Sequence, residues 1–290
     1  MDLLLEAMTM AVAEAKLSLR EGNHGFGAVV LNEERIVSQA HDRDETERDP
    51  TSHAETNAIR LAARELGKDL SACTIVSTHE PCPMCASAIV WAGINEVAYG
   101  YSIEQAIAQG RDRIAIGCRE VFERSGRMIF VRPGVLAGEC VPLYDRAVRK
   151  EVKRLRNASR ETLREHDRVS AEHRLQWFED SAGTSAFRSG DPLEDAYALL
   201  LRRLGISADQ APIVEKSQSN LVFHSKNPCP TLQACELLGL DTRLVCRHYN
   251  EGATDALVKC IDRRLRFTRN YDRLRPYSEF CEEMIILDQS

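Results

Sequence analysis

Two short motifs bring together residues that can hold a metal ion and move protons. In the first, His53 is followed two residues later by Glu55, and in the second, Cys82 and Cys85 follow Pro81. One imidazole and two thiolates are ligands that zinc prefers, and three protein ligands leave the fourth tetrahedral position open for water, as is typical of catalytic sites. Glu55 is not needed as a ligand, so its carboxylate can act as acid and base beside that water. We therefore predict a catalytic Zn²⁺ centre built from these residues.

The elements that must position these residues are two helices that each begin at a strand end. Helical spacing of apolar residues over 52–66 places His53 and Glu55 in a first turn, and a strand over 73–78 runs into a second helix that begins near Cys82. The positive end of a helix stabilises carboxylates and thiolates. Ligands at helix starts can converge on one point, the usual place for a site in an α/β sheet.

The rest of the first half also alternates between helical and strand patterns. Helical spacing predicts a first helix over 2–20. The further expected elements are strands at 26–31, 35–39, 95–100 and 128–131 and short helices near 102–109 and 118–124. Residues 135–180 read as mostly helical, with nine Lys/Arg against five Asp/Glu between Tyr144 and Arg168. That charge excess fits either a nucleic-acid contact or a solvated helix face, and we favour the solvated face.

The paired motifs, His-x-Glu and Pro-Cys-x-x-Cys, form the known signature of zinc deaminases. On these residues, roughly the first half of the chain resembles the cytidine deaminase superfamily, and within it the branch of guanine deaminase, fungal-type cytosine deaminase and tRNA adenosine deaminase. The resemblance implies a three-layer αβα sandwich of the cytidine deaminase type and a homodimer. The structural alternative is a buried histidine with two structural cysteines.

The resemblance also implies substrate contacts beyond the metal. Phe26 begins a strand that, in this family, passes close to the bound base. The alternative is a strand whose small residues serve only its packing. Backbone groups around Ala54 would hydrogen-bond the base. In guanine-type members of the family, Glu80 would assist at the site. The alternative is that Glu80 is a carboxylate at a helix start. Trp177 matches a C-terminal helix that closes over the base in fungal-type cytosine deaminases, or else it docks that helix on the core.

One position departs from the family pattern. An Asn commonly lies eleven residues before the zinc-binding histidine and binds the base edge, whereas this chain has Asp42 there. Asn offers a donor and an acceptor, but an ionised Asp only accepts. Asp42 therefore favours a ring that presents N–H groups at that edge, such as an aminated triazine, an isocytosine-like ring or an aminothiazoline.

These residues together predict a zinc-dependent hydrolytic deaminase of a free nucleobase or a similar amino-substituted heterocycle. Zinc-bound hydroxide would attack the amine-bearing carbon of a guanine- or cytosine-type ring, Glu55 would shuttle protons, and ammonia would leave. Two alternatives stay open: an adenosine deaminase acting on tRNA, which shares the zinc motif, and a non-catalytic zinc-stabilised scaffold for a C-terminal sensing domain. The negative net charge argues against the first, and the presence of Glu55 argues against the second.

The composition limits the class of protein. At 290 residues, 43% hydrophobic and 28% charged, the chain has room for two domains. The early charges and the lack of a long apolar run argue against a signal peptide or a membrane span, so we expect a cytoplasmic protein. Its ten cysteines then read as thiols or metal ligands. A net charge of −6 lacks the basic footprint of a dedicated nucleic-acid binder, so a small-molecule heterocycle is the expected partner.

A change of pattern divides the chain. Small polar residues over 181–192 read as a linker. We therefore expect a zinc deaminase domain over 1–155, a helical connector and linker over 156–190, and a smaller Cys-rich α+β domain over 191–290. Its expected elements are helices at 193–204, 231–238 and 252–263 and strands at 212–216, 220–224, 265–270 and 283–287.

The C-terminal half contains a second group of cysteines. The residues around Cys229, Cys246 and Cys281 are similar to a small family named for L-2-amino-thiazoline-4-carboxylate hydrolase. The spacing of these cysteines matches no common zinc pattern, so they form either a shared site or a set of buried thiols. This half would be a second enzyme acting on the deaminated ring, or a ligand-sensing and dimerising module.

Overall fold

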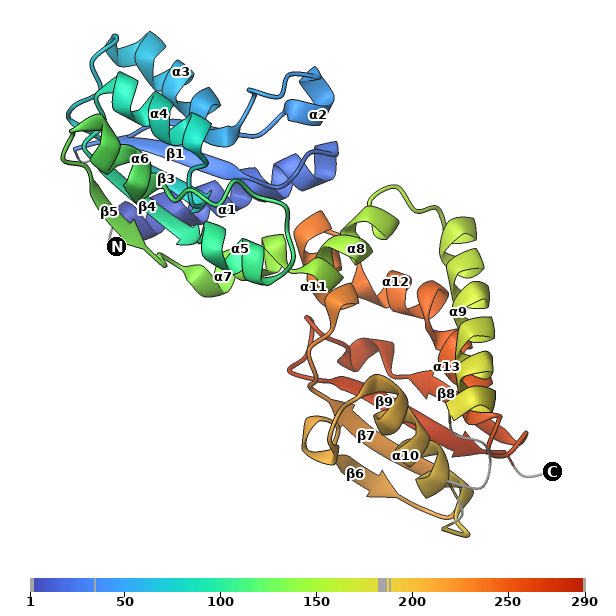
Figure 1. The fold of residues 1–290 in the computed structure, drawn as a ribbon. Helices are drawn as coiled ribbons and strands as arrows, with labels where there is room; N and C mark the ends of the chain where they lie inside the picture. The colour runs from blue at the N-terminus through green and yellow to red at the C-terminus, as the bar shows by residue number, and fades with distance from the viewer. Residues whose placement is uncertain (1–2, 34, 182–186, 188, 289–290) are drawn as a thin grey trace. The chain divides into compact units, whose positions relative to one another are not determined.

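A five-stranded mixed sheet forms the centre of the N-terminal half in the computed structural model, which describes residues 3–33, 35–181, 187 and 189–288 (Figure 1). The strands are β1 (Gly27–Asn32), β2 (Arg35–His41), β3 (Cys73–His79), β4 (Glu96–Tyr101) and β5 (Phe130–Pro133). They lie in the order β2-β1-β3-β4-β5. Strand β1 is antiparallel to both β2 and β3, whereas β3, β4 and β5 are parallel. The carboxyl ends of β3 and β4 therefore meet at one edge, where parallel sheets place their sites.

Helices cover both faces of this sheet. They are α1 (Leu3–Glu21), α2 (Asp44–Glu47), α3 (Ala54–Leu66), α4 (Pro83–Ala92), α5 (Ile103–Ala108), α6 (Cys118–Ser125), α7 (Ala137–Tyr144) and α8 (Arg146–Leu155). Helices α3, α4 and α6 bury small and aromatic side chains against one face, and α1 and α7 pack on the other (Figure 1). The predicted three-layer αβα sandwich is confirmed.

Small residues let the layers approach closely. The alanines Ala54, Ala58 and Ala62 point from α3 into the core and are fully buried. A Cβ atom at Gly27 would lie 1.9 Å from the Ala11 carbonyl oxygen of α1, so the start of β1 accepts only glycine. This close contact holds the turn before β1, which carries Phe26, in place.

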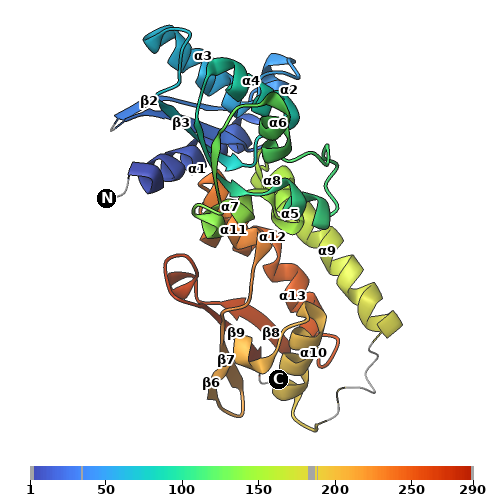
Figure 2. The same ribbon diagram turned by 60° about the vertical axis from the view of Figure 1, so that its left-hand side comes forward.

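The C-terminal half forms a separate four-stranded antiparallel sheet in the order β6-β7-β9-β8. Its strands are β6 (Ile213–Lys216), β7 (Asn220–Ser225), β8 (Leu265–Arg269) and β9 (Cys281–Leu287), and its helices are α9 (Arg160–Ser181), α10 (Pro192–Leu204), α11 (Pro230–Leu238), α12 (Thr242–Tyr249) and α13 (Glu251–Val258). Short 3₁₀ turns occupy Ala208–Gln210 and Tyr271–Arg273. Helix α9 lies beside α12 and α13 (Figure 2). This is the expected further α+β region.

The chain divides into compact units of Met1–Arg156 and Asn157–Ser290, so α9 belongs to the second unit. The residues 182–186 and 188, which we expected in a linker, lie outside the described residues. Helices α2 and α12 were not expected, because both are too short to show a clear helical period. Within the described part of the chain, no helix is long and apolar enough to span a membrane.

Candidate active site

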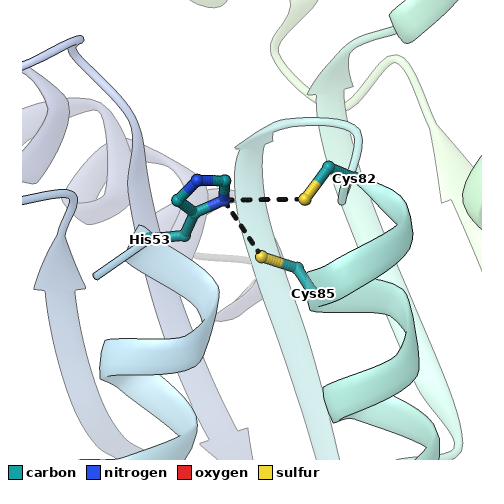
Figure 3. A group of neighbouring side chains, drawn as sticks. All are labelled: His53, Cys82 and Cys85. Carbon is teal, nitrogen blue, oxygen red and sulfur yellow. Dashed lines mark hydrogen bonds between the residues drawn. The ribbon is translucent and has the colours of Figure 1, made fainter. Parts of the chain in front are cut away.

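The three predicted metal ligands meet where two helices begin (Figure 3). His53 precedes α3 and Cys82 precedes α4, both with extended backbone, and Cys85 lies in the first turn of α4. Pro83 begins α4, where the missing N–H of proline has no cost because that group has no partner within the helix. Both helix starts thus place sulfur and nitrogen atoms at the same point.

The spacing of these ligand atoms fits zinc. His53 Nδ1 lies 3.5 Å from Cys82 Sγ and 3.4 Å from Cys85 Sγ. The three atoms all lie within 4.8 Å of one another. Ligands at bond lengths of about 2.0–2.3 Å around a tetrahedral zinc ion lie roughly 3.5–3.8 Å apart. The site therefore offers Zn²⁺ three suitable donors.

The pKa values of these three groups depend on one another. A hydrogen bond with Cys85 lowers the pKa of Cys82 to about 4. The same hydrogen bond, reinforced by burial, raises the pKa of Cys85, and the contact with Cys82 raises the pKa of His53 to about 9. Zinc requires deprotonated thiolates and a neutral imidazole, so its binding would release protons from this group.

Glu55 lies beside the ligands in the first turn of α3. Its side chain is buried, and its Oε1 accepts a hydrogen bond of 3.1 Å from the Ser77 hydroxyl of β3. Burial raises the pKa of Glu55, and the neighbouring Cys82 thiolate raises it further. A raised pKa makes a carboxyl group hold its proton more readily, which suits the part of a general acid.

Glu55 and two of the ligands open into a pocket of about 520 Å³. This volume is within the range of about 300–1,000 Å³ that small-molecule sites occupy. The lining residues are His24, Phe26, Asp42, Asp44, His53, Glu55, His79, Glu80, Cys82, Met84, Ile103, Arg111, Asp112, Arg113 and Ile114. The pocket therefore unites the predicted Phe26, Asp42 and Glu80 with the metal ligands.

His79 belongs to the aromatic wall of this pocket and was not predicted. Its ring lies edge-on to those of Phe26 and Tyr144, at 5.4 Å and 5.1 Å. Its Nδ1 lies 2.9 Å from the Glu80 carbonyl oxygen, which only accepts, so Nδ1 carries the proton. Burial lowers the pKa of His79 to about 4, and its buried Nε2 has no hydrogen-bond partner among the described residues. The available signal was its position directly before Glu80 at the end of a strand.

Two arginines from the loop between α5 and α6 also line the pocket. Arg111 Cζ lies 5.8 Å from the centre of the Tyr144 ring, and Arg113 Cζ lies 5.5 Å from that of Phe26. Guanidinium groups at such distances are attracted to aromatic faces. No periodic pattern in the sequence indicates where this loop lies, so neither arginine was predicted.

The carboxylate of Asp42 is already engaged within the chain. Its Oδ1 accepts hydrogen bonds from the Ser18 hydroxyl at 2.6 Å and the Phe26 N–H at 2.7 Å. Its Oδ2 accepts one from the His24 N–H at 2.8 Å. Asp42 therefore lines the pocket and also holds the turn that carries Phe26.

Glu80 joins two helix starts. Its Oε2 accepts a hydrogen bond from the Ile103 N–H of α5, and its Oε1 accepts one from the Cys118 N–H of α6, both at 2.9 Å. Of our two interpretations of Glu80, this geometry matches the carboxylate at a helix start, although it serves α5 and α6 instead of α4.

Two further predicted residues do not line the pocket. Ala54 is fully buried between His53 and Glu55, so only its backbone could reach a substrate. Trp177 belongs to the second unit, and its role as a cover over the base stays a prediction. Trp177 packs against the core of the second unit, with Arg203 Cζ 5.2 Å from its ring centre. Within the second unit this contact fits the alternative interpretation, in which the ring docks its helix on the core.

Comparison with known proteins agrees with this geometry. Residues 1–101 match the family model for the cytidine and deoxycytidylate deaminase zinc-binding region. The expected metal, Zn²⁺, is therefore the metal of the matched family.

Curated relatives carry several substrate names. The chain is 31% identical over 159 residues to a tRNA-specific adenosine deaminase of Bacillus subtilis. This match covers 54% of this chain and 96% of the relative. The chain is 40% identical over 93 residues to a tRNA-specific adenosine deaminase of Aquifex aeolicus, covering 32% of this chain and 62% of that protein. The chain is also 40% identical over 88 residues to a guanine deaminase of Bacillus subtilis. That match covers 30% of this chain and 56% of the guanine deaminase. The chain spans about three fifths of the length of several such relatives.

Solved structures include the same kinds of enzyme. The structure of a tRNA:A34 deaminase is 26% identical in sequence to this chain, with a TM-score of 0.42. The match covers 48% of this chain and 98% of that structure. A guanine deaminase from Nitrosomonas europaea is 25% identical with a TM-score of 0.43, over 48% of this chain and 81% of that one.

The predicted resemblance is thus confirmed by a relative matched over nearly its whole length. The two ligand motifs also meet at one point beside a pocket, as a zinc site requires. The chain therefore belongs to the cytidine and deoxycytidylate deaminase family of zinc-binding aminohydrolases.

Proposed function

We propose that the first unit catalyses the hydrolytic deamination of a free nucleobase or a similar amino-substituted heterocycle. The observation that carries this proposal is the position of Glu55, whose buried carboxylate lines the same pocket as His53 and Cys82. A purely structural zinc site would have no use for a carboxylate there. The pocket is of the size that holds one small molecule.

The residues divide the chemistry among them. His53, Cys82 and Cys85 would hold zinc, which when bound lowers the pKa of a water molecule from 15.7 toward about 7. Glu55 would accept a first proton from the attacking water and deliver it to the ring nitrogen. It would then move the second proton, from the hydroxyl now bonded to the ring carbon, to the departing amine, so that water and the aromatic amine become the oxo ring and ammonia. Ser77 keeps the Glu55 carboxylate oriented. Phe26 and its aromatic neighbours offer a flat wall for the ring.

The polar groups of the pocket favour a ring that carries N–H donors. His79 Nε2 offers a lone pair without a partner among the described residues. The Asp42 carboxylate already accepts from Ser18, His24 and Phe26, which leaves it one acceptor position for a ring N–H. This supports the proposal of an amino-rich ring, as the Asp in place of Asn first indicated. Comparing Asp42→Asn with the wild type on guanine and on ammeline tests it. A shift of preference toward guanine is the expected result, and an unchanged preference would refute it.

A second candidate is deamination of adenosine in tRNA. The relative matched over 96% of its length is a tRNA-specific adenosine deaminase, and α8 carries several basic residues. Arg111 and Arg113 at the pocket could also face a phosphate backbone. The overall charge of −6 weakens this candidate.

One assay separates these candidates. Zinc-loaded protein is incubated with guanine, cytosine, adenine, isocytosine, ammeline, the matching nucleosides and a tRNA anticodon stem containing adenosine, and ammonia release is measured. Release from a free ring that disappears in Glu55→Ala supports the leading proposal. Release from the RNA alone, falling steeply with added salt, supports the second. Elemental analysis should show that Glu55→Ala retains zinc. The loss of ammonia release then comes from the missing carboxylate and not from loss of the metal.

We also propose that the protein is a cytoplasmic homodimer. The dimer rests on the family resemblance, and light scattering of the purified full chain would test it. A mass of about 32.6 kDa in solution would refute it, because that is the mass of one chain.

A further inference from the structure

The second unit contains a small, partly open cavity that the deaminase function does not use. Its volume is about 120 Å³, and it is lined by residues from the sheet and from four helices. The lining includes the arginines Arg174, Arg203, Arg269 and Arg275, the acid Glu283 and the cysteines Cys229, Cys246 and Cys281. The three cysteines singled out in the sequence thus share one cavity, although they do not form a metal-binding group among the described residues.

Positive charge dominates this cavity. Four arginines face one carboxylate, and that carboxylate is fully engaged: Glu283 Oε1 accepts from Arg269 Nε at 2.8 Å, and its Oε2 accepts from the Ser225 hydroxyl at 2.6 Å. Burial, together with repulsion from Arg203 and Arg269, lowers the pKa of Arg174 to about 10. Charges buried in proteins are normally paired, so this excess calls for an anion.

The hydrogen bonds of the arginines are also incomplete. The Arg269 side chain is 9% exposed, yet its Nη1 has no partner among the described residues. The same holds for Arg203 Nε, and Arg203 lines the same cavity. Arg174 Nη1 donates to Thr254 Oγ1 at 2.7 Å, which fixes that guanidinium at the wall. Leaving buried polar groups unsatisfied is costly, and a ligand would satisfy them.

The remaining wall restricts the ligand. It is apolar, formed by Leu200, Leu204, Phe223, Leu257, Phe267 and Leu274. The cavity is smaller than the roughly 300 Å³ at which pockets for drug-sized molecules begin. A bare inorganic ion would leave the apolar wall unfilled. The occupant must combine one anionic group with a short apolar body.

We propose that this cavity binds a small organic carboxylate, held through its carboxyl group by Arg174 and Arg269. Guanidinium groups match carboxylates in geometry and charge. Cys281, whose Sγ lies 3.4 Å from Arg275 Nε, stands in the same cavity and reports on its occupancy. The second unit is then a ligand-binding module with a site separate from the deaminase pocket.

The test uses thiol protection in the full-length protein. Cys229, Cys246 and Cys281 are partly exposed, so their alkylation by N-ethylmaleimide can be followed residue by residue by mass spectrometry. Propionate, butyrate and isobutyrate are compared with their uncharged amides at equal concentration. Labelling of Cys281 should slow by about tenfold at a carboxylate concentration ten times the dissociation constant, because only the free form reacts. Cys260, which does not line the cavity, should be unaffected.

Two variants decide the result. Arg174→Met removes the charge but keeps much of the side-chain length, and it should abolish protection by the carboxylates. Arg243→Met alters an exposed arginine paired with Asp241 and should leave protection unchanged. Equal protection by amides, protection that persists in Arg174→Met, or no protection by any of the three acids would overturn the proposal. If Arg174→Met fails to fold, Arg269→Lys, which keeps the charge but removes the planar fork, replaces it and should weaken protection.

Discussion

The Ser77 hydroxyl donates a hydrogen bond of 3.1 Å to Glu55 Oε1, and this contact joins the proposed acid and base on α3 to the buried strand β3. Ser77 is fully buried, so the contact is shielded from water. The carboxylate that must move protons is therefore oriented by the central sheet itself. Removing the carboxylate and removing its support should have different consequences.

Glu55→Gln should lower the rate of ammonia release by about 10²–10⁴-fold, the usual contribution of a general acid and base. Ser77→Ala should lower kcat only about three- to tenfold, because it removes one neutral hydrogen bond to the carboxylate. Steady-state kinetics with equal zinc content in both variants checks this. Equal losses in the two variants would contradict the separate roles.

Cys85→Ser should lose zinc. The hydroxyl of serine does not ionise readily, so the site would keep only His53 and Cys82 as good donors. Elemental analysis after dialysis should show zinc near one per chain in the wild type and strongly reduced zinc in the variant. Cys260→Ser, in the second unit, serves as the matched control and should retain the metal. Full zinc occupancy in Cys85→Ser would show that other residues hold the ion.

Glu80→Gln should destabilise the first unit by about 1–3 kcal/mol, because an amide nitrogen would face a backbone N–H at one of the two helix starts. Thermal unfolding without substrate measures this directly. The Michaelis constant should rise as well, since the loop with Arg111 and Arg113 lies between those helices. A changed Michaelis constant with unchanged unfolding would instead assign Glu80 to substrate contact alone.

His41 should make stability depend on pH. Its hydrogen bond with Glu14, of 2.6 Å, is the main cause that raises the pKa of His41, and Glu21 adds to it. The pKa of His41 in the folded state is therefore above its ordinary value of about 6.5. This stabilisation is complete below pH 6.5 and disappears as pH rises through the pKa of the folded state, because the imidazole then loses the proton that holds the two carboxylates.

The measurement is the unfolding free energy of the wild type and of His41→Gln between pH 6 and pH 9. The wild type should lose stability relative to His41→Gln as pH rises. Glu14→Gln should show most of the same loss of pH dependence. Parallel pH profiles in all three proteins would contradict this origin.

The sequence was sufficient to single out the three residues whose side chains meet at two helix starts, and to locate most of the elements, because both depend on local patterns. His53, Cys82 and Cys85 stand in motifs whose spacing reflects helix starts, and periodicity located the helices and strands around them. The substrate wall was harder to predict. Arg111 and Arg113 lie in a loop between two helices whose first N–H groups bond to Glu80, a tertiary contact that no local pattern predicts. For Trp177 two roles stay open, because a short aromatic match does not say which core buries the ring; within the second unit the ring packs on that unit's core.

Because Glu80 binds the first N–H groups of both α5 and α6, the chain between them is closed into a loop with a common anchor. Its length and composition can change without moving His53, Cys82 or Cys85, which are held by other helices. The fold therefore separates the catalytic machinery from an exchangeable recognition segment. Grafting loops between such enzymes at Ile103 and Cys118 would give a direct route to engineering new substrate preferences.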